Sequence, residues 1–305
     1  MNKVRENIKR INKKGLVAFS EPLSGYTTFR IGGPADVFVC PGDQQELKET
    51  LQLLSDEQVP VFILGGGANI LVSDKGFRGA VVSLSKLDRI TQQGSNLIIE
   101  AGAKVSEVSA YAAQKGLAGF DFIYAMPGSF GGAVWMNARC YGGEIGDVLT
   151  RVSYLDDQLN LQTMVPKREE FQYKDTPFMS HSWIILEGEL SLTPCNDLEG
   201  LWSTMHSYED DRRQKGHFTA PCAGSIFKNN RDFGAPSGKL IDSIGLKGYR
   251  HGGAQIHPHH GNIIINTGQA TATEISELID LIQERVLKEL GFLLEPEVLK
   301  VGDWD

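Results

Sequence analysis

Three consecutive glycines, Gly65 to Gly67, directly follow a strand-like run, VFIL at 61–64, and this feature restricts the possible folds most. Because glycine has no Cβ, a glycine cluster that opens off a strand either makes a tight turn or lets the backbone approach a ligand. A Rossmann turn is excluded because further strand-like runs, ILVSD and GAVVSL, follow the glycines instead of a helix. The SGKL segment at 237–240 is not a P-loop, because it lacks the upstream glycine and a hydroxyl residue after the lysine.

A helix is predicted just before this cluster. Asp43 and Glu46 have the spacing of a capping pair, and Leu47, Leu51 and Leu54 fall on one helical face. Pro60 ends this region, and VFIL is expected to form a buried strand.

A second glycine-rich stretch, PGSFGGAVWMNARCYGGEIGD, begins at Pro127. We interpret it either as a loop packed against a flat group or as a series of tight bends. A helix from about 105 to 115 precedes it, and TRVSYLDD and SWIILEGELSL predict strands after it. A further helix is expected near 198–211.

The last third of the chain contains the clearest helix signal. Thr271 and Glu274 form a predicted capping box, and Gly291 is placed to end the helix. EPEVLKVG is expected to form a final strand. The apolar face of the helix comprises Ile275, Leu278, Ile279, Ile282 and Val286.

Length and charge narrow the class of protein. The chain has 305 residues, enough for two or three domains, and its net charge of −8 argues against nucleic-acid or membrane-surface binding. The basic N-terminal segment has apolar residues at helical spacing, which argues against a signal peptide, and no run is long enough for a bilayer. The four cysteines stand far apart without a C-x-x-C pair, so neither a zinc site nor a disulfide framework is predicted. We therefore expect a cytoplasmic protein.

Six segments in the same order resemble the UDP-N-acetylenolpyruvoylglucosamine reductases, the MurB family, from about Thr27 to Val298. They are TTFRIGGPAD, LGGGANILVSDKGFRG, MPGSFGGAVWMNARCYGGEIGDV, CAGSIFKNN, GKLIDSIGLKGYRHGGAQIH and LLEPEV. The uninterrupted GLKGYRHGGAQ is similar to the shorter subtype of that family.

The resemblance implies an α+β fold, with a two-part FAD-binding fold of the vanillyl-alcohol-oxidase (PCMH) type and a C-terminal α+β substrate-binding domain. The implied boundaries are 1–86 and 87–210 for the two FAD-binding subdomains and 211–305 for the substrate domain, with the last strand able to return to the FAD-binding part. It also implies that NADPH reduces FAD, and that the flavin then reduces an enolpyruvyl nucleotide sugar for peptidoglycan synthesis.

The resemblance also assigns roles to individual residues. The glycine cluster would hold the flavin diphosphate through main-chain amides, and the second glycine stretch would approach the flavin ring. Ser225 corresponds to the family's proton donor, and Glu297, after the proline of EPEV, to its glutamate. The cofactor-binding candidates are Gly65, Gly66, Gly67, Ala68, Asn69, Ile70, Pro127, Gly128, Ser129 and Gly132.

One catalytic position departs from the family pattern. FQYKDTPF places Lys174 where the family has an arginine that polarises the substrate carboxylate, and Thr176 where it has a serine. Lysine keeps the positive charge but loses the two-pronged geometry of arginine. We expect Lys174 to serve as the third catalytic residue; the alternatives are altered substrate handling or replacement by Arg139, which stands where the family shows a small residue.

Further polar residues are candidates either for substrate binding or for support of the site. The HPHH run at 257–260 suits a loop better than a metal site, and no metal is expected. A flavin oxidase of the same fold and a non-catalytic nucleotide-sugar-binding relative are the alternative functions, and we expect a monomer whose partner is its small-molecule substrate. The substrate candidates are Tyr173, Lys228, Asn229, Tyr249 and Gln255.

Overall fold

The computed structural model describes residues 2–305 and divides the chain into two compact units, each built from pieces far apart in the sequence. The first unit contains the residues up to Phe19, Val37–Gly66 and Gly79–Asp210. The second contains Ser20–Asp36, Gly67–Arg78 and Asp211–Asp305. Met1, the start of the predicted 1–86 subdomain, lies outside the described residues.

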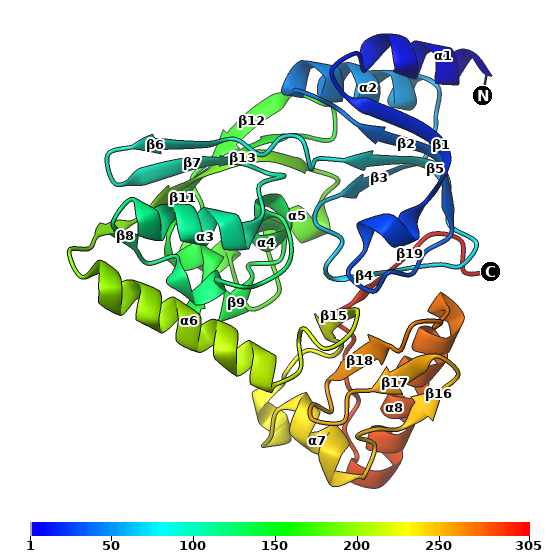
Figure 1. The fold of residues 1–305 in the computed structure, drawn as a ribbon. Helices are drawn as coiled ribbons and strands as arrows, with labels where there is room; N and C mark the ends of the chain where they lie inside the picture. Colours follow the sequence, from blue (N-terminus) through cyan, green and yellow to red (C-terminus); the bar gives the residue numbers. More distant parts are fainter. Residues whose placement is uncertain (1) are drawn as a thin grey trace. The chain divides into compact units, whose positions relative to one another are not determined.

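A four-stranded sheet with order β1-β2-β5-β3 stands near the N-terminus (Figure 1). The boundary between the units falls within β1, β2 and β5. The strand β3 pairs in parallel with β5 at the edge of the sheet. The strands are β1 (Leu16–Pro22), β2 (Pro34–Cys40), β3 (Val61–Leu64) and β5 (Phe77–Ser83).

This edge position corrects one expectation. The VFIL strand is not buried: Val61 is 37% exposed, and Leu64 is the one residue of β3 in the buried class. An edge strand has a neighbour on one side alone, so its side chains keep more contact with water.

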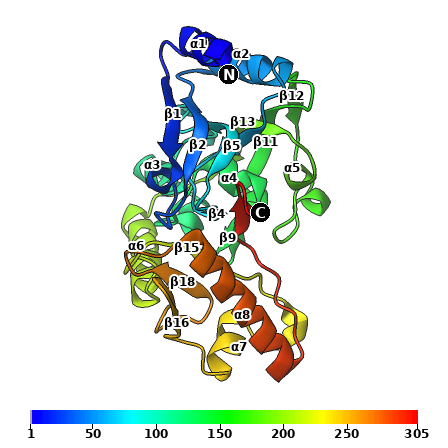
Figure 2. The same cartoon turned by 90° about the vertical axis from the view of Figure 1, so that its right-hand side faces the viewer.

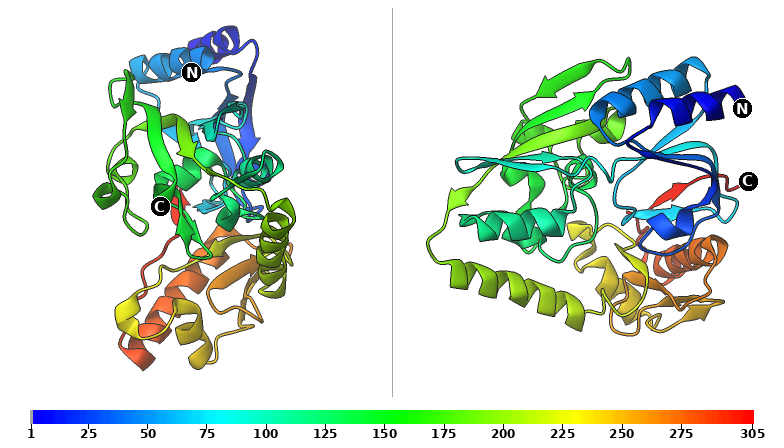
Figure 3. Two further views of the ribbon diagram at one scale, coloured as in Figure 1. Left: turned by 90° about the vertical axis from the view of Figure 1, so that its left-hand side faces the viewer. Right: turned by 45° about the horizontal axis from the view of Figure 1, so that its top comes forward.

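Two helices, α1 (Asn2–Ile11) and α2 (Gln44–Asp56), lie side by side in the first unit (Figure 3). They share a core in which Ile8 and Leu47 are fully buried. The predicted cap at Asp43 is confirmed, since its Oδ1 accepts a hydrogen bond from the Glu46 amide at 2.9 Å. The Glu46 carboxylate instead accepts from the amides of Gly42 and Lys14, both at 2.8 Å. Glu46 thereby ties the start of α2 to the segment after α1.

A five-stranded antiparallel sheet follows in the first unit, with order β12-β11-β13-β7-β6. Its strands are β6 (Ile90–Gln93), β7 (Asn96–Glu100), β11 (Leu149–Leu155), β12 (Leu161–Met164) and β13 (Ile184–Ser191). The helices are α3 (Val105–Gln114), α4 (Phe130–Trp135), α5 (Pro177–Ser180) and α6 (Leu198–Gln214), the last of which continues into the second unit. The short elements are β8 (Leu117–Ala118), β9 (Arg139–Cys140), β10 (Gly143–Glu144) and β14 (Thr193–Pro194).

The second unit is built on the four-stranded antiparallel sheet β15-β18-β17-β16 and the helix α8, which contacts β16 and β17 (Figure 2). Both halves of the predicted capping box between Thr271 and Glu274 are present, and Gly291 ends α8 with a φ of +77°. All five residues of the predicted apolar face are buried. The elements are β15 (Cys222–Ser225), α7 (Ser237–Ser243), β16 (Arg250–His251), β17 (Ala254–Ile256), β18 (Ile263–Asn266) and α8 (Ala272–Leu290).

Long-range contacts explain why 20–36 and 67–78 belong to the second unit. The strand β4 (Ile70–Val72) pairs in parallel with β19 (Leu299–Val301). Asp74 accepts hydrogen bonds from the amides of Ala272 at 2.8 Å and Thr273 at 3.0 Å, and so caps α8 from 198 residues away. Asn266 donates its side-chain amide to the carbonyl of Phe29 at 3.0 Å. Within residues 2–305, no helix has the length and apolar character needed to cross a membrane.

Candidate active site

The two glycine segments meet within the first unit. The amides of Gly66 and Gly132 both donate to the hydroxyl oxygen of Ser129, at 3.2 Å and 3.3 Å. A Cβ added to Gly66 would lie 2.6 Å from the Cα of Gly128, closer than real Cβ atoms come. The two backbones therefore touch, and this contact requires glycine at position 66.

The second glycine stretch contains a helix, α4, which corrects its interpretation as a loop or a series of bends. Ser129 caps this helix, and the amide of Gly131 donates to the carbonyl of Ala101 at 2.8 Å. A Cβ on Gly131 would lie 2.8 Å from the Cβ of Ala101. Close packing against Ala101 therefore overrides the low helix propensity of glycine.

These segments fit a flavin nucleotide. A Cβ added to Gly65 would collide with the hydroxyl oxygen of Ser129, and one added to Gly66 would collide with the backbone of Gly128 and Ser129, so the two segments lie in close contact. Backbone of this kind can hold phosphate oxygens and can lie against a flat ring.

The rest of the first glycine cluster belongs to the second unit. Gly67 has a φ of +60°, and its carbonyl accepts from the amide of Thr28 at 3.0 Å. The side-chain amide of Asn69 donates to the carbonyl of Glu297 at 3.0 Å. Asn69, predicted to bind the cofactor, therefore also holds the backbone at a predicted catalytic residue.

The structure brings Ser225 and Glu297 into neighbouring segments of the second unit. Ser225 is the half-buried last residue of β15. The carbonyl of the next residue, Ile226, accepts a hydrogen bond from the amide of Glu297 at 2.7 Å, and the amide of Lys228 donates to the carbonyl of Glu295 at 2.9 Å. The segments 225–228 and 295–297 therefore run side by side.

Asn262 supports this arrangement and was missed by the sequence analysis. It is 3% exposed, and its side chain both accepts from the amide of Phe227 and donates to the carbonyl of Phe227, each at 2.9 Å. The residue lies just before β18, and its long-range role has no signal in the local sequence.

The predicted substrate residues of the second unit lie in two places. The ammonium group of Lys228 pairs with the Glu295 carboxylate at 2.5 Å. Asn229 accepts from the amide of Ser237 at 2.9 Å. Tyr249 is 41% exposed beside the β16–β17 hairpin, and Gln255 in that hairpin donates to the carbonyl of Gly248 at 3.0 Å.

Tyr173 and Lys174 form the tip of a tight turn in the first unit. Gln172 and Asp175 close the turn through two backbone hydrogen bonds, at 2.9 Å and 3.3 Å, and Lys174 has a φ of +55°. Thr176, at the end of the turn, donates its hydroxyl to the carbonyl of Trp135 at 2.6 Å. The family-like segment is thus anchored to the last residue of α4.

Arg139 lies outside this turn. It is an exposed residue of β9 and stands opposite Glu144 of β10. Lys174, and not Arg139, is therefore the cation on the turn itself.

The HPHH run forms a turn stabilised by its own histidines. The Nδ1 of His257 accepts from the amide of His259 at 3.1 Å, and its Nε2 lies 3.0 Å from the Thr219 hydroxyl. Burial is the main cause that lowers the pKa of His257 and of His260. Within the described residues, no group of three or more His, Cys, Asp or Glu side chains is arranged to hold a metal ion.

Two family models match the chain. Residues 35–159 match an FAD binding domain, and residues 216–301 match the C-terminal domain of UDP-N-acetylenolpyruvoylglucosamine reductase. These matches confirm the predicted α+β fold, with an FAD-binding part followed by a C-terminal domain of this family.

Curated relatives of the same family match nearly the full length of the chain. The UDP-N-acetylenolpyruvoylglucosamine reductase of Treponema denticola is 42% identical over 96% of this chain and 95% of the relative. That of Caldanaerobacter subterraneus subsp. tengcongensis is 40% identical over 98% of each chain.

A solved structure agrees as well. The crystal structure of UDP-N-acetylenolpyruvylglucosamine reductase (MurB) from Thermus caldophilus has a TM-score of 0.77 to this chain at 31% identity, covering 94% of this chain and 98% of the other. The shared order of segments, the two matched domains and the full-length likeness lead to one conclusion: this chain belongs to the UDP-N-acetylenolpyruvoylglucosamine reductase (MurB) family.

Proposed function

We propose that this chain is an FAD-dependent reductase that uses NADPH to convert UDP-N-acetylglucosamine enolpyruvate to UDP-N-acetylmuramate in peptidoglycan synthesis. The observation that carries the proposal is the 42% identity to a reductase of this name over 96% of the chain. The matched FAD binding domain and the two touching glycine segments support the choice of cofactor.

The reaction adds a hydride to one carbon of the enolpyruvyl double bond and a proton to the other. When bound, FAD would supply the hydride chemistry that links NADPH to the substrate. Gly65, Gly66, Ser129 and Gly132 would hold this cofactor, and the full set of cofactor residues is that predicted from the sequence. The protein must then stabilise negative charge on the substrate carboxylate and deliver the proton.

We assign to Ser225 the role of donating the proton to the substrate carbon. A serine hydroxyl is a weak acid, so it needs a nearby cation or proton relay when it releases its proton. The segments 225–228 and 295–297 run side by side, which places Lys228 and Glu297 on chain adjacent to Ser225. These two residues are the candidates for that support.

Lys174 supplies positive charge for the substrate carboxylate. Its position at the tip of a closed two-residue turn restricts the backbone that carries the ammonium group. A lysine binds a carboxylate with less geometric precision than the two-pronged arginine of the family. A fixed backbone compensates for part of this loss.

The remaining roles follow the same scheme. Tyr173, Lys228, Asn229, Tyr249 and Gln255 are assigned to the nucleotide sugar. We further propose that the protein is a monomer. We place it in the cytoplasm, where NADPH and nucleotide sugars are found, and we propose no nucleic-acid partner because the net charge is −8.

The test separates the two half-reactions on purified protein. Yellow protein that binds FAD and oxidises NADPH in proportion to added enolpyruvyl nucleotide is the expected result. Colourless protein that takes up no FAD would refute the proposal and favour a nucleotide-sugar-binding relative. A bound flavin that NADPH does not reduce, but that oxidises another alcohol, would favour the oxidase alternative.

A further inference from the structure

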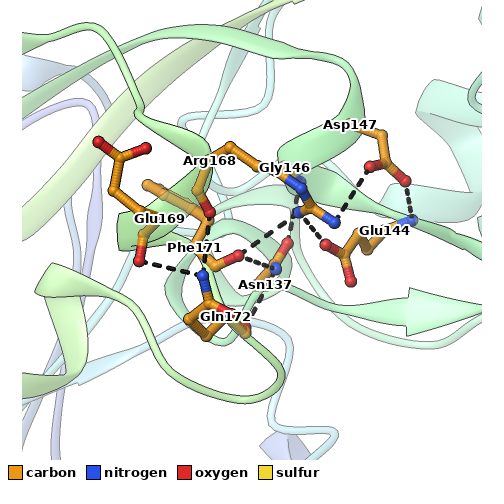
Figure 4. Close-up of polar contacts among 8 residues, drawn as sticks. All are labelled: Asn137, Glu144, Gly146, Asp147, Arg168, Glu169, Phe171 and Gln172. Atoms are coloured by element: carbon orange, nitrogen blue, oxygen red, sulfur yellow. Dashed lines mark hydrogen bonds and ion pairs between the residues drawn. The ribbon is translucent and has the colours of Figure 1, made fainter.

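Asn137 makes an unusual set of contacts next to the turn that carries Lys174. The residue has an exposure of 0% and a φ of +44°, a backbone conformation that asparagine tolerates better than most residues. Its side-chain amide donates to the carbonyls of Phe171 at 3.2 Å and Gln172 at 3.1 Å. Its side-chain oxygen accepts from the amide of Gly146 at 2.9 Å (Figure 4).

These contacts hold the base of the turn. Gln172 is the residue that pairs with Asp175 to close the turn around Tyr173 and Lys174. Fixing the carbonyl of Gln172 therefore fixes where the turn begins, while the bond from Thr176 to Trp135 fixes where it ends.

A second group holds the approach to the turn. Arg168 forms an ion pair with the buried Glu144 and lies 3.6 Å from the carboxylate of Asp147. The side-chain amide of Gln172 reaches back to the carbonyls of Arg168 at 3.2 Å and Glu169 at 3.0 Å (Figure 4).

The helix α4 connects these anchors to the predicted flavin segment. It starts after Ser129, which bonds to Gly66, and it ends at Trp135, two residues before Asn137. The short helix α4 thus has the glycine contact at its start, one anchor of the Lys174 turn at its last residue, Trp135, and the other two residues further on, at Asn137.

We propose that Asn137 is a positioning residue that sets the place of Lys174 relative to the glycine segments at the start of α4. This inference rests on the proposed function, in which Lys174 acts on the substrate carboxylate. The residue itself is fully buried, so it acts through the turn and touches neither substrate nor cofactor.

The sharpest perturbation is Asn137→Asp. Aspartate has the same shape, tolerates the same backbone conformation and still accepts from Gly146, but it loses both donors and turns an oxygen toward the two carbonyls. Asn137→Gly removes the side chain without adding charge, and it serves if the aspartate variant does not fold.

A matched control exists in the same unit. Asn12 is 6% exposed, and its side-chain amide also makes two hydrogen bonds, to the carbonyl of Ile8 at 3.0 Å and the hydroxyl of Thr50 at 2.8 Å. Asn12→Asp makes the same substitution at a buried site between α1 and α2; there the side-chain oxygen has no hydrogen-bond partner, and the Thr50 hydroxyl can turn to donate to the new carboxylate. Any loss caused merely by general destabilisation appears in both variants.

The first measurement is hydrogen exchange of the Gln172 and Asp175 amides, which needs no turnover. We expect faster exchange in Asn137→Asp than in the parent protein and in Asn12→Asp. Unchanged exchange at these amides would overturn the inference, whatever the enzyme catalyses.

The second measurement is a double-mutant cycle on kcat/KM for the enolpyruvyl nucleotide. Asn137→Asp should lose about 10- to 100-fold in the parent background, because small displacements of a positioned group cost this much. It should lose little more once Lys174→Ala is present, because the group it positions is already gone.

Two outcomes separate the claims. An equal loss in both backgrounds would show that Asn137 does not act through Lys174, which overturns the inference while leaving the proposed function in place. A parent protein that does not reduce the nucleotide refutes the proposed function, and the exchange measurement then still decides whether Asn137 holds the turn.

Discussion

If the two glycine segments hold FAD, as we propose, their close contact should make FAD binding sensitive to a single added methyl group. In Gly66→Ala, the new Cβ would lie 2.6 Å from the Cα of Gly128 and 2.7 Å from the amide nitrogen of Ser129. Ordinary contact begins at 3.4 Å, so the segments must part by about 0.8 Å. All of these neighbours are backbone atoms, which cannot rotate away as a side-chain end can.

The cost follows from this displacement. Forcing one extra methyl into a closely packed place costs about 1–3 kcal/mol. If FAD requires the native spacing, its dissociation constant rises about 5- to 150-fold, since each 1.4 kcal/mol is a factor of ten. The same movement stretches the hydrogen bond from the Gly66 amide to the hydroxyl oxygen of Ser129. Ser129 is also the residue that caps α4.

Gly132→Ala is the matched variant in the same cluster. Its Cβ meets the Ser129 hydroxyl at 3.3 Å, a contact that a small adjustment relieves, and alanine favours the helix α4. We therefore expect Gly132→Ala to keep the stability of the apoprotein, and to weaken FAD binding if the flavin lies against this glycine.

The assay titrates FAD into apoprotein of each variant, following the quenching of flavin fluorescence, with thermal unfolding of the apoprotein in parallel. Gly66→Ala should lose both affinity and stability, whereas Gly132→Ala should lose affinity alone. A Gly66→Ala protein that binds FAD as tightly as the parent would refute the reasoning from backbone contact.

The remaining predictions concern catalysis and pH. Ser225→Ala should keep flavin reduction by NADPH but slow substrate reduction by about 10²–10⁴-fold, as measured in separate half-reactions; unchanged turnover would reduce Ser225 to a structural residue. Lys174→Arg should preserve or improve kcat/KM, and a severe loss would show a pocket built around lysine. Burial, helped by the positive charges of Arg212 and Lys215, lowers the pKa of His217 from 6.5 to about 3. Between pH 6.5 and about pH 3, His217 is therefore protonated in the unfolded chain but neutral in the folded one. The free energy of unfolding should fall as pH falls below 6.5, by at most about 1.4 kcal/mol per pH unit. Urea titrations at several pH values check this, and a His217→Gln variant with the same pH slope as the parent would contradict it.

Elements with complete local signals could be predicted from the sequence. The helix α8 has its cap at Thr271, its apolar spacing and its terminating glycine all within about 20 residues, and each was found as expected. The cap of α2 at Asp43 was predictable for the same reason.

Features that depend on distant contacts could not be predicted. The helix α4 contains two glycines, and its stability depends on packing against Ala101, which no local pattern reveals. The left-handed backbone of Lys174 results from the closure of a turn whose anchors lie at Asn137 and Trp135. The motifs marked Lys174 as a departure from the family, but they carried no information about what holds it.

The pairing of β4 with β19 has a consequence for how the protein is made. The residues 70–72 leave the ribosome more than 200 residues before their partner strand, 299–301, exists. Asp74 is likewise made long before the start of α8, which it caps in the folded protein. During synthesis, most of the first unit is made while the second unit remains incomplete. The strand β4 of the second unit then lacks its partner and can pair with a wrong strand. We therefore expect the second unit to fold after release of the chain, and a chaperone that shields an unpaired strand would raise the yield of active protein.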